Sequence, residues 1–265
     1  MSMSYEISMI GSGNVAWHLA MTLDNAGYPV KEVYSRNFRN AEALVDRLYG
    51  AEPKSDLDFS NSPSQLFIIS VSDDAIKEIV REIILPEEAI LVHTSGTKPL
   101  NAMEFAATKH VGVFYPLQTF SKSRRIEFSE VPLCLEAADG YTKRVLKEIA
   151  NNISKHVAMI DSANRAILHI AAVFACNFTN HLFKIAEDIL DEHKLKFDLL
   201  KPLIVETVNK SLEMGASISQ TGPAVRQDFE VLDKHMEKLE YNEEYAEIYR
   251  LLSQNIIDTY GESEE

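Results

Sequence analysis

The chain opens with residues 5–10, YEISMI, which run directly into residues 11–16, GSGNVA. The first segment is short, apolar and rich in β-formers, and a helical pattern follows the glycines at once, so we expect a strand, a tight turn and a helix. The spacing G-x-G-x-x-A between strand and helix is a variant of the dinucleotide-binding fingerprint. Gly11 permits the turn, Gly13 lets the backbone approach a pyrophosphate, and Ala16 allows close packing of helix on strand.

This glycine loop has two interpretations. A helix N-terminus offers free N–H groups and a positive dipole end to phosphates, which favours a cofactor site. The alternative is a tight turn between strand and helix with no ligand. Under the first interpretation, the expected cofactor contacts are Gly11, Ser12, Gly13, Asn14 and Val15, together with Ser70 and Val71 at the end of a later strand.

Short β-rich runs alternate with amphipathic helical patterns over the first 160 residues. We expect strands at residues 5–10, 30–34, 66–71, 89–93, 111–115, 132–136 and 157–160. We expect helices at residues 14–26, 40–49, 73–84, 100–107 and 140–153, with Asp73 and Asp74 capping the third. Such alternation is typical of βαβ units and of a mostly parallel sheet.

After residue 160 the strand signal stops. Residues 161–192 have the apolar periodicity of one long helix, and further helices are expected at 199–214, 227–239 and 243–260. The predicted fold is therefore α/β, with a Rossmann-type dinucleotide-binding domain over residues 1–160. An all-helical domain over residues 161–265, for substrate binding and dimerisation, follows it.

Composition excludes several classes of function. The chain has 265 residues with 26 basic and 40 acidic side chains, a net charge of −14, which disfavours nucleic-acid binding. The last 25 residues carry seven acids and one base, which predicts a solvated acidic end. We find no basic leader, no run of about 18 apolar residues and no metal-type cysteine spacing. We therefore expect a cytoplasmic protein that binds no membrane and no metal.

Cofactor choice depends on the end of the second expected strand, where the sequence is Tyr34-Ser35-Arg36. A site that prefers NAD usually carries an acid there for the ribose 2′-hydroxyl. Here Arg36 can bind a 2′-phosphate through its guanidinium and Ser35 can donate a hydrogen bond, which predicts NADP. The alternative is an exposed turn without a ligand, and Arg39 is the substitute if Arg36 points into solvent.

Six segments occur in an order that resembles a known family. They are GSGNVAWHLA, YSR, HTSG at 93–96, YPLQTF at 115–120, HIAAVFACNFTNHL and TGPAVRQD at 221–228. Together they resemble the Rossmann-like NADP oxidoreductases with a helical C-terminal domain of unknown function. That group is similar to pyrroline-5-carboxylate reductase and 6-phosphogluconate dehydrogenase. The resemblance implies an NADP oxidoreductase and a dimer paired through the helical domain.

Two loops at expected strand ends carry candidate substrate contacts. Ser95 and Gly96 resemble the Ser-Gly segment that contacts substrate in the hydroxyacid dehydrogenases, while His93 either binds a ligand or satisfies backbone groups. Gln118 offers neutral hydrogen bonds in the loop after Tyr115, where some relatives carry a histidine; the alternative is a packed loop.

The long helix carries the candidate proton donor. Arg165, His169, Cys176 and Asn180 are expected on the side opposite the apolar stripe, with Asn177 on its flank. The lysine that protonates a carbonyl oxygen in the hydroxyacid dehydrogenases is absent, which leaves His169 as the acid near neutral pH. The alternative is a structural histidine at the domain junction.

The segment at 221–228 differs at one position from the family that it resembles. Arg226 is a candidate for holding an anionic substrate group, or else for pairing with Asp228, which is expected to cap the next helix. The family tends to have glycine between them, whereas this chain has Gln227.

Two functions follow from these patterns. The first is an NADP-dependent oxidoreductase that reduces a small carbonyl or imine in a cleft between the domains. The second is a non-catalytic NADP-binding protein that senses the redox state, and NADPH turnover would distinguish the two. For the enzyme, the expected catalytic residues are His169, Asn177 and Ser95, and the expected substrate contacts are Gly96, Gln118, Asn180 and Arg226.

Overall fold

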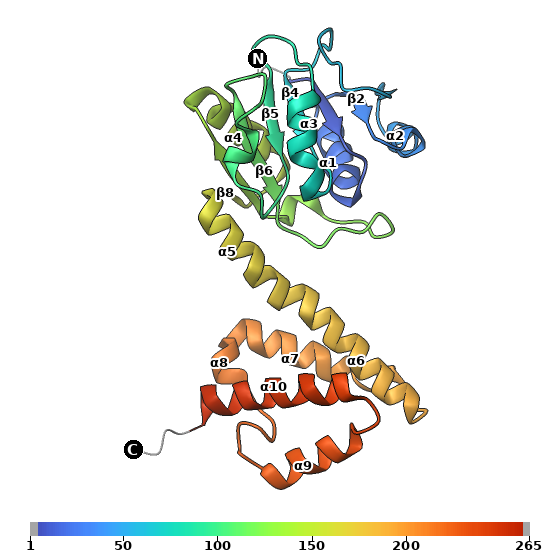
Figure 1. The fold of residues 1–265 in the computed structure, drawn as a ribbon, viewed down its shortest axis with the longest axis vertical. Coiled ribbons are helices and arrows are strands. Elements are labelled where there is room, and N and C mark those ends of the chain that lie inside the picture. The colour runs from blue at the N-terminus through green and yellow to red at the C-terminus, as the bar shows by residue number, and fades with distance from the viewer. Residues whose placement is uncertain (1–4, 262–265) are drawn as a thin grey trace. The chain divides into compact units, whose positions relative to one another are not determined.

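Within the described residues, 5–261, eight strands form one sheet in the first part of the chain (Figure 1). The structure is a computed structural model. It does not describe the first four residues or the last four, so the beginning of the N-terminal segment and the end of the acidic segment lie outside it. The strands are β1 (Ile7–Ile10), β2 (Val30–Tyr34), β3 (Glu52–Lys54), β4 (Leu66–Ile69), β5 (Ile90–His93), β6 (Val111–Pro116), β7 (Leu133–Ala137) and β8 (Val157–Met159).

The sheet order is β3-β2-β1-β4-β5-β6-β7-β8. The pairs from β3 to β6 are parallel, β6 and β7 are antiparallel, and β7 and β8 are parallel. The crossover from β3 to β4, on the other side of β1, creates the switch in strand order at which such sheets bind ligands. The prediction of a Rossmann-type α/β fold is confirmed.

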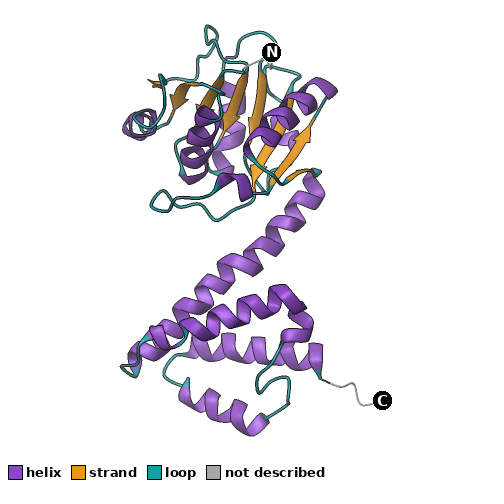
Figure 2. Ribbon diagram, turned by 180° about the vertical axis from the view of Figure 1, so that it is seen from behind, coloured by secondary structure: helices purple, strands orange, loops and turns teal. Residues whose placement is uncertain are grey.

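Helices cover both faces of this sheet, as Figure 2 shows. On one face, α1 (Asn14–Asn25), α2 (Phe38–Val45) and α4 (Gly140–Ile153) pack on a core that includes Met9, Ile68 and Val92. On the other face, α3 (Ile76–Glu82) packs on a second core that includes Phe67 and Leu91. The side chains of one strand alternate between these two cores, because successive residues of a strand point to opposite faces.

Three details differ from the sequence-based expectations. The short edge strand β3 was not predicted, because its sequence, Glu-Pro-Lys, has no apolar pattern. Residues 100–107 form only a 3₁₀ turn, η2 (Leu100–Met103), in place of an α-helix. Asp73 does not cap α3. It lies within the 3₁₀ turn η1 (Asp73–Ala75), and its carboxylate accepts a hydrogen bond from the Thr97 hydroxyl.

The chain divides into two compact units, residues 1–176 and 177–265. A continuous helical stretch runs through α5 (Ser162–Ala172), the π-turn η4 (Val173–Phe178) and α6 (Thr179–Glu192). The division lies within η4, because α5 is bonded into the first unit through Arg165. The second unit also contains η5 (Phe197–Leu199), α7 (Lys201–Met214), α8 (Ala216–Ser219), α9 (Phe229–Lys238) and α10 (Glu243–Tyr260).

The stretch Ser162–Glu192 is the candidate membrane-spanning helix among the described residues, by length and composition alone. Burial along α5 does not follow its apolar stripe. Arg165, expected on the polar side opposite that stripe, is fully buried, whereas Ile167 and Ile170 of the stripe are 65% and 54% exposed. Helical periodicity shows which residues share a face and not which polar residues have partners. Arg165 is buried because its guanidinium donates to a carboxylate and to a carbonyl oxygen of the first unit.

The second unit has little buried apolar surface of its own. In α7, no described residue is buried, and Leu203, Val208 and Leu212 are 60%, 45% and 81% exposed. Large exposed apolar patches mark surfaces that bind another protein or a membrane.

Candidate functional site

A cavity of about 780 Å³ lies at the carboxyl ends of β1, β2, β4 and β5, entirely within the first unit. This is the edge of the sheet at which open α/β folds bind ligands, and the volume suits a small molecule or cofactor. All nine predicted cofactor contacts line it. The lining includes Gly11, Ser12, Gly13, Asn14, Val15, Ser35, Arg36, Asn37, Asn40, Ser70, Val71, Asp73, Ser95, Gly96, Thr97, Lys122 and His169.

The two glycines of the loop meet different surroundings. Gly11 has φ +119°, and a Cβ added to it would lie 2.1 Å from the carbonyl oxygen of Ser70, so the loop packs against the end of β4. Gly13 has ordinary φ, and a Cβ there would meet no atom within 4 Å. Gly11 is therefore required by the protein itself. Gly13 leaves open space in the cavity.

The N-terminus of α1 faces this space. Its N-cap is Gly13, which offers no side-chain cap, so the first N–H groups of the helix have no side-chain acceptor at that cap. Such a terminus attracts anions through its N–H groups and its dipole.

The end of β2 is tied to the glycine loop by a side-chain hydrogen bond. The hydroxyl of Ser12 donates to that of Ser35 at 2.9 Å. Arg36 follows, is exposed, and has no carboxylate partner within the described residues. Asn37 caps α2 by accepting from the amide of Arg39 at 3.2 Å, and Arg39 does not line the cavity. Arg36 is thus available to an anion at this end of the cavity.

The loop after β5 forms a turn closed by Ser95. Its Oγ accepts from the amides of Thr97 at 3.1 Å and Lys98 at 2.9 Å, and it lies 3.4 Å from the hydroxyl oxygen of Thr97. Because the Thr97 hydroxyl donates its proton to Asp73, the Ser95 hydroxyl is the donor in this long contact. His93 is fully buried, and its Nδ1 accepts from the amide of Ser95 at 3.1 Å. Burial, with Arg165 nearby, lowers the pKa of His93 to about 4. His93 therefore holds the turn in its neutral form and is not among the residues that line the cavity.

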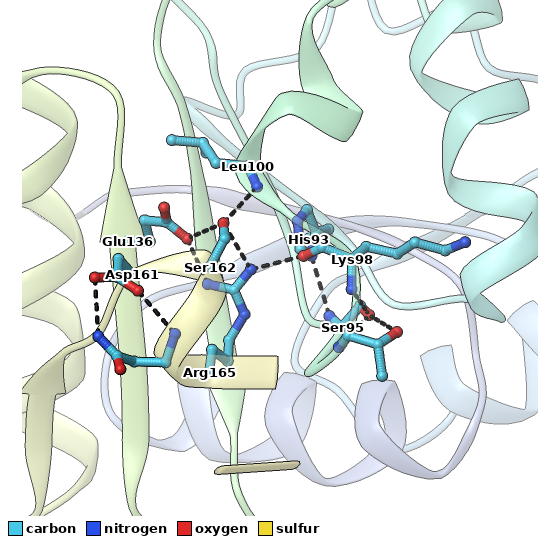
Figure 3. Close-up of polar contacts among 10 residues, drawn as sticks. His93, Ser95, Lys98, Leu100, Glu136, Asp161, Ser162 and Arg165 are labelled. Atoms are coloured by element: carbon cyan, nitrogen blue, oxygen red, sulfur yellow. Dashed lines mark hydrogen bonds and ion pairs between the residues drawn. The ribbon is translucent and has the colours of Figure 1, made fainter. Parts of the chain in front are cut away.

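Arg165 joins the start of α5 to this loop, as Figure 3 shows. Its guanidinium donates to the carboxylate of Glu136 and, at 2.6 Å, to the carbonyl oxygen of Lys98. The hydroxyl of Ser162 donates to the same carboxylate at 2.7 Å and accepts from the amide of Leu100 at 2.8 Å. These bonds hold α5, and with it His169 one turn later, at a defined place beside the Ser95 turn.

His169 lines the cavity and is half-buried. Its Nδ1 lies 3.1 Å from the phenol oxygen of Tyr115, at the end of β6. Ser95, Gly96 and His169 therefore lie together at the β5 end of the cavity. Arg36, after β2, lies at the opposite end, because β1 and β4 stand between β2 and β5 in the sheet.

Four predicted site residues are not brought to this cavity. Gln118 is exposed, and its Oε1 accepts from the amide of Thr119 at 2.8 Å. Asn177, Asn180 and Arg226 belong to the second unit and are exposed.

The loop that carries Arg226 takes a backbone shape that usually needs glycine. Gln227 has φ +53°, so this chain keeps the left-handed turn with a non-glycine residue. Asp228 caps α9 as expected, since its carboxylate accepts from the amide of Val231 at 3.3 Å. No ion pair joins Arg226 to Asp228 among the described residues.

Lys122 lines the cavity and was not predicted as a site residue. Its ammonium lies 4.9 Å from the centre of the Trp17 ring. Next to it, the carbonyl of Ser121 accepts from Nε2 of the buried His18 at 2.9 Å, which ties this loop to α1. No local pattern points to Lys122, because its place depends on contacts with a helix more than a hundred residues earlier in the chain.

Comparison with known proteins places the chain among related folds. Residues 131–256 match the family model of a domain of unknown function, DUF2520. A crystallised Bacteroides fragilis protein, named as a proposed NADP oxidoreductase, is 39% identical, with 96% of this chain and 98% of that one covered and a TM-score of 0.89. No protein of curated function matches.

Two more distant structures share the fold. The Aspergillus terreus reductive aminase, solved with NADPH and ethyl levulinate, is 12% identical, with 98% of this chain and 96% of that one covered and a TM-score of 0.72. A pyrroline-5-carboxylate reductase from Coxiella burnetii is 14% identical, with coverage of 97% and 99% and a TM-score of 0.58.

Proposed function

The chain belongs to the family of the Bacteroides fragilis protein, the Rossmann-like NADP oxidoreductase type with a DUF2520 C-terminal domain, and from this premise we propose that it is an NADP-dependent oxidoreductase. The observation that carries the proposal is the cavity itself. At one end the cavity is lined by the N-terminus of α1, which has no side-chain cap, by Gly13, and by Arg36, which has no carboxylate partner among the described residues. At the other end it is lined by Ser95 and His169.

The residues present fit NADP. The N–H groups at the start of α1 suit the pyrophosphate, and the space beside Gly13 admits it. Arg36 and Ser35 suit the 2′-phosphate, and Lys122 adds a second cation to the lining. The strand order separates β2 from β5 by three strand spacings, roughly 14 Å, so the two ends of an extended dinucleotide reach different groups.

When bound, the reduced cofactor supplies the hydride. The residues of the chain then have two tasks at the β5 end of the cavity. Ser95, whose hydroxyl proton is held by a long, 3.4 Å contact with Thr97, turns that proton to a polar substrate atom, and the backbone of Gly96 lies beside it. His169 donates a hydrogen bond to the oxygen or nitrogen that gains negative charge as hydride arrives, and so assists its protonation. A small carbonyl or imine meets these requirements. Asn177, Asn180, Gln118 and Arg226 stay sequence-based predictions of substrate contacts.

The test is NADPH consumption, followed by absorbance, across a panel of small ketones and aldehydes with and without amines. We expect turnover with at least one member of the panel. Replacing His169 by Gln is expected to lower kcat by roughly 10²–10⁴-fold without changing NADPH affinity. NADPH binding without any turnover would favour the redox sensor, and a His169→Gln variant with unchanged kcat would remove this residue from the mechanism.

The assembly is proposed to be a cytoplasmic homodimer paired through the second unit. Its support is the exposed apolar surface of α7, which includes Leu203, Val208 and Leu212, and two-fold dimers are the commonest oligomers. Light scattering at micromolar concentration is expected to give the dimer mass, and Leu212→Glu to give the monomer mass. A monomeric wild-type chain would contradict the proposal.

A further inference from the structure

We propose that Tyr115 is a positioning residue that selects the ring tautomer of His169, so that the neutral imidazole presents Nε2–H to a ligand. The inference rests on the proposed function and concerns the neutral ring, which donates a hydrogen bond from Nε2–H to the substrate atom that gains charge, while the proton that the product keeps comes from water. It assigns to Tyr115 a role in the chemistry, although Tyr115 itself is not among the residues that line the cavity.

The two side chains meet at a single polar contact. The phenol oxygen of Tyr115 lies 3.1 Å from Nδ1 of His169, and the rings stand edge to face with centroids 6.2 Å apart. Tyr115 is 9% exposed and is held in β6, next to Cys134 of β7. Because Nδ1 is occupied by this contact, Nε2 is the ring nitrogen left for a ligand.

The burial of the phenol favours one direction for this hydrogen bond, from the Tyr115 hydroxyl to Nδ1 of His169. Burial raises the pKa of Tyr115 to about 12, so the phenol keeps its proton throughout the range in which histidine titrates. A buried phenol O–H needs an acceptor, and an unprotonated Nδ1 is one. The neutral ring then carries its proton on Nε2. The other titratable groups that act on Tyr115 are Cys134 on β7, Arg165 on α5 and Asp73 on η1.

Gly96 packs directly on this pair. A Cβ added to Gly96 would lie 2.7 Å from Cζ of Tyr115 and 2.8 Å from Nδ1 of His169. The turn after β5 therefore closes against both rings at once and leaves the imidazole little room to turn over. This contact gives a physical reason for glycine at position 96, which has no side chain to displace either ring.

Arg165 fixes the position of the helix that carries His169. It lies one turn before His169 on α5 and is bonded to Glu136 and to the carbonyl of Lys98 (Figure 3). The helix is thus fixed by Arg165, and the imidazole at its next turn is fixed by Tyr115 and Gly96. A hydrogen-bond donor held in this way meets the substrate in one orientation, as the stabilisation of charge that develops in the transition state requires.

The first test needs no substrate. Protein labelled with ¹⁵N-histidine is followed by long-range ¹H–¹⁵N correlation against pH, with His169→Gln used to assign the ring signals. In the wild type we expect the neutral His169 to show an unprotonated Nδ1 and a protonated Nε2. In Tyr115→Phe we expect a mixture of tautomers and a shifted titration midpoint. A mixed tautomer in the wild type, or a Tyr115→Phe variant with unchanged signals, overturns the proposal.

The second test is kinetic and uses whichever carbonyl or imine the panel identifies. Loss of one hydrogen bond is worth about 0.5–1.5 kcal/mol, so Tyr115→Phe is expected to lower kcat by roughly 2–10-fold. It should also shift the pH profile of kcat and leave the KM for NADPH unchanged. The matched control, Tyr141→Phe, alters a tyrosine that contacts His110 and is expected to change neither.

The two proposals fail in different ways. If the wild-type protein shows no turnover, the proposed function fails, and the NMR experiment still decides whether Tyr115 selects the tautomer. If turnover is present and Tyr115→Phe leaves kcat and its pH profile unchanged, the positioning role of Tyr115 is wrong and the oxidoreductase stands.

Discussion

Arg165 is fully buried, and its guanidinium is paired with the carboxylate of Glu136, which is 17% exposed. The pair joins the first turn of α5 to β7, and its two residues lie 29 positions apart in the chain. Because Arg165 also bonds the carbonyl of Lys98, a single side chain links a helix, a strand and the turn that carries Ser95.

We expect Arg165→Ala to lower the free energy of unfolding by about 3–5 kcal/mol, since it leaves the Glu136 carboxylate without its partner. Arg165→Met keeps most of the volume and should cost less. Urea denaturation followed by circular dichroism measures both. The double variant with Glu136→Gln tests the pairing, because it should lose much less than the sum of the single changes. Additive losses would show that the two residues act independently.

Substitutions at the two glycines of the loop after β1 should have different effects, one on NADPH binding and the other on stability. Gly13→Val should abolish NADPH binding in titration calorimetry while the melting temperature stays within a few degrees, because the new side chain enters open space in the cavity. Gly11→Ala should instead destabilise the fold, since φ +119° and the Ser70 carbonyl exclude a Cβ.

A matched control for these variants is Gly140→Ala at the start of α4. There too a Cβ meets no atom within 4 Å, and Gly140 does not line the cavity. It should leave both binding and stability near wild type. Retained NADPH affinity in Gly13→Val would refute the assignment of the glycine loop to the cofactor.

Arg36 should set the choice of cofactor. A hydrogen bond to a charged group contributes roughly 1.5–3 kcal/mol, which corresponds to a tenfold to hundredfold preference for NADPH over NADH. Arg36→Asp should reverse the preference, because a carboxylate repels the 2′-phosphate and accepts from a free 2′-hydroxyl. The dissociation constants of the wild type and of Arg36→Asp for NADPH and NADH measure this preference. Arg39→Asp is the control, and equal affinity of the wild type for both cofactors would count against the assignment.

The stability of the first unit should depend on pH through His110, just before β6. Its Nδ1 and Nε2 each lie 3.0 Å from a carboxylate, of Asp139 and Glu88 respectively, and only the doubly protonated ring can donate to both. The hydrogen bond to Asp139, with that to Glu88, raises the pKa of His110 against the opposing effect of burial. The pairing therefore stabilises the fold fully below the unfolded pKa of about 6.5 and loses this effect as pH rises through the folded value.

His110→Gln is the variant that reports this effect. The difference in melting temperature between wild type and variant should be largest at about pH 5.5 and should shrink as pH rises above about 6.5. Scanning fluorimetry across this range measures the difference. A difference that stays constant or grows with pH would contradict the pairing.

Local sequence determined much of the cavity lining at the ends of β1 and β2. The glycine loop, the helix that follows it and the Ser35-Arg36 turn lie within about two dozen residues, and strand periodicity placed both segments at the same edge of one sheet. These features were predictable because each depends on neighbours in the chain: a turn that needs Gly11, a helix that starts at Asn14, and an alternating strand.

Tertiary structure decided the arrangement at the β5 end of the cavity. Helical periodicity showed which residues of α5 share a side, but not that Arg165, on the polar side, is buried in an ion pair with Glu136. Tyr115 and His169 are 54 residues apart, and Lys122 reaches the cavity through a loop tied to His18. Contacts of this kind depend on how folded elements pack, and no spacing within one segment encodes them.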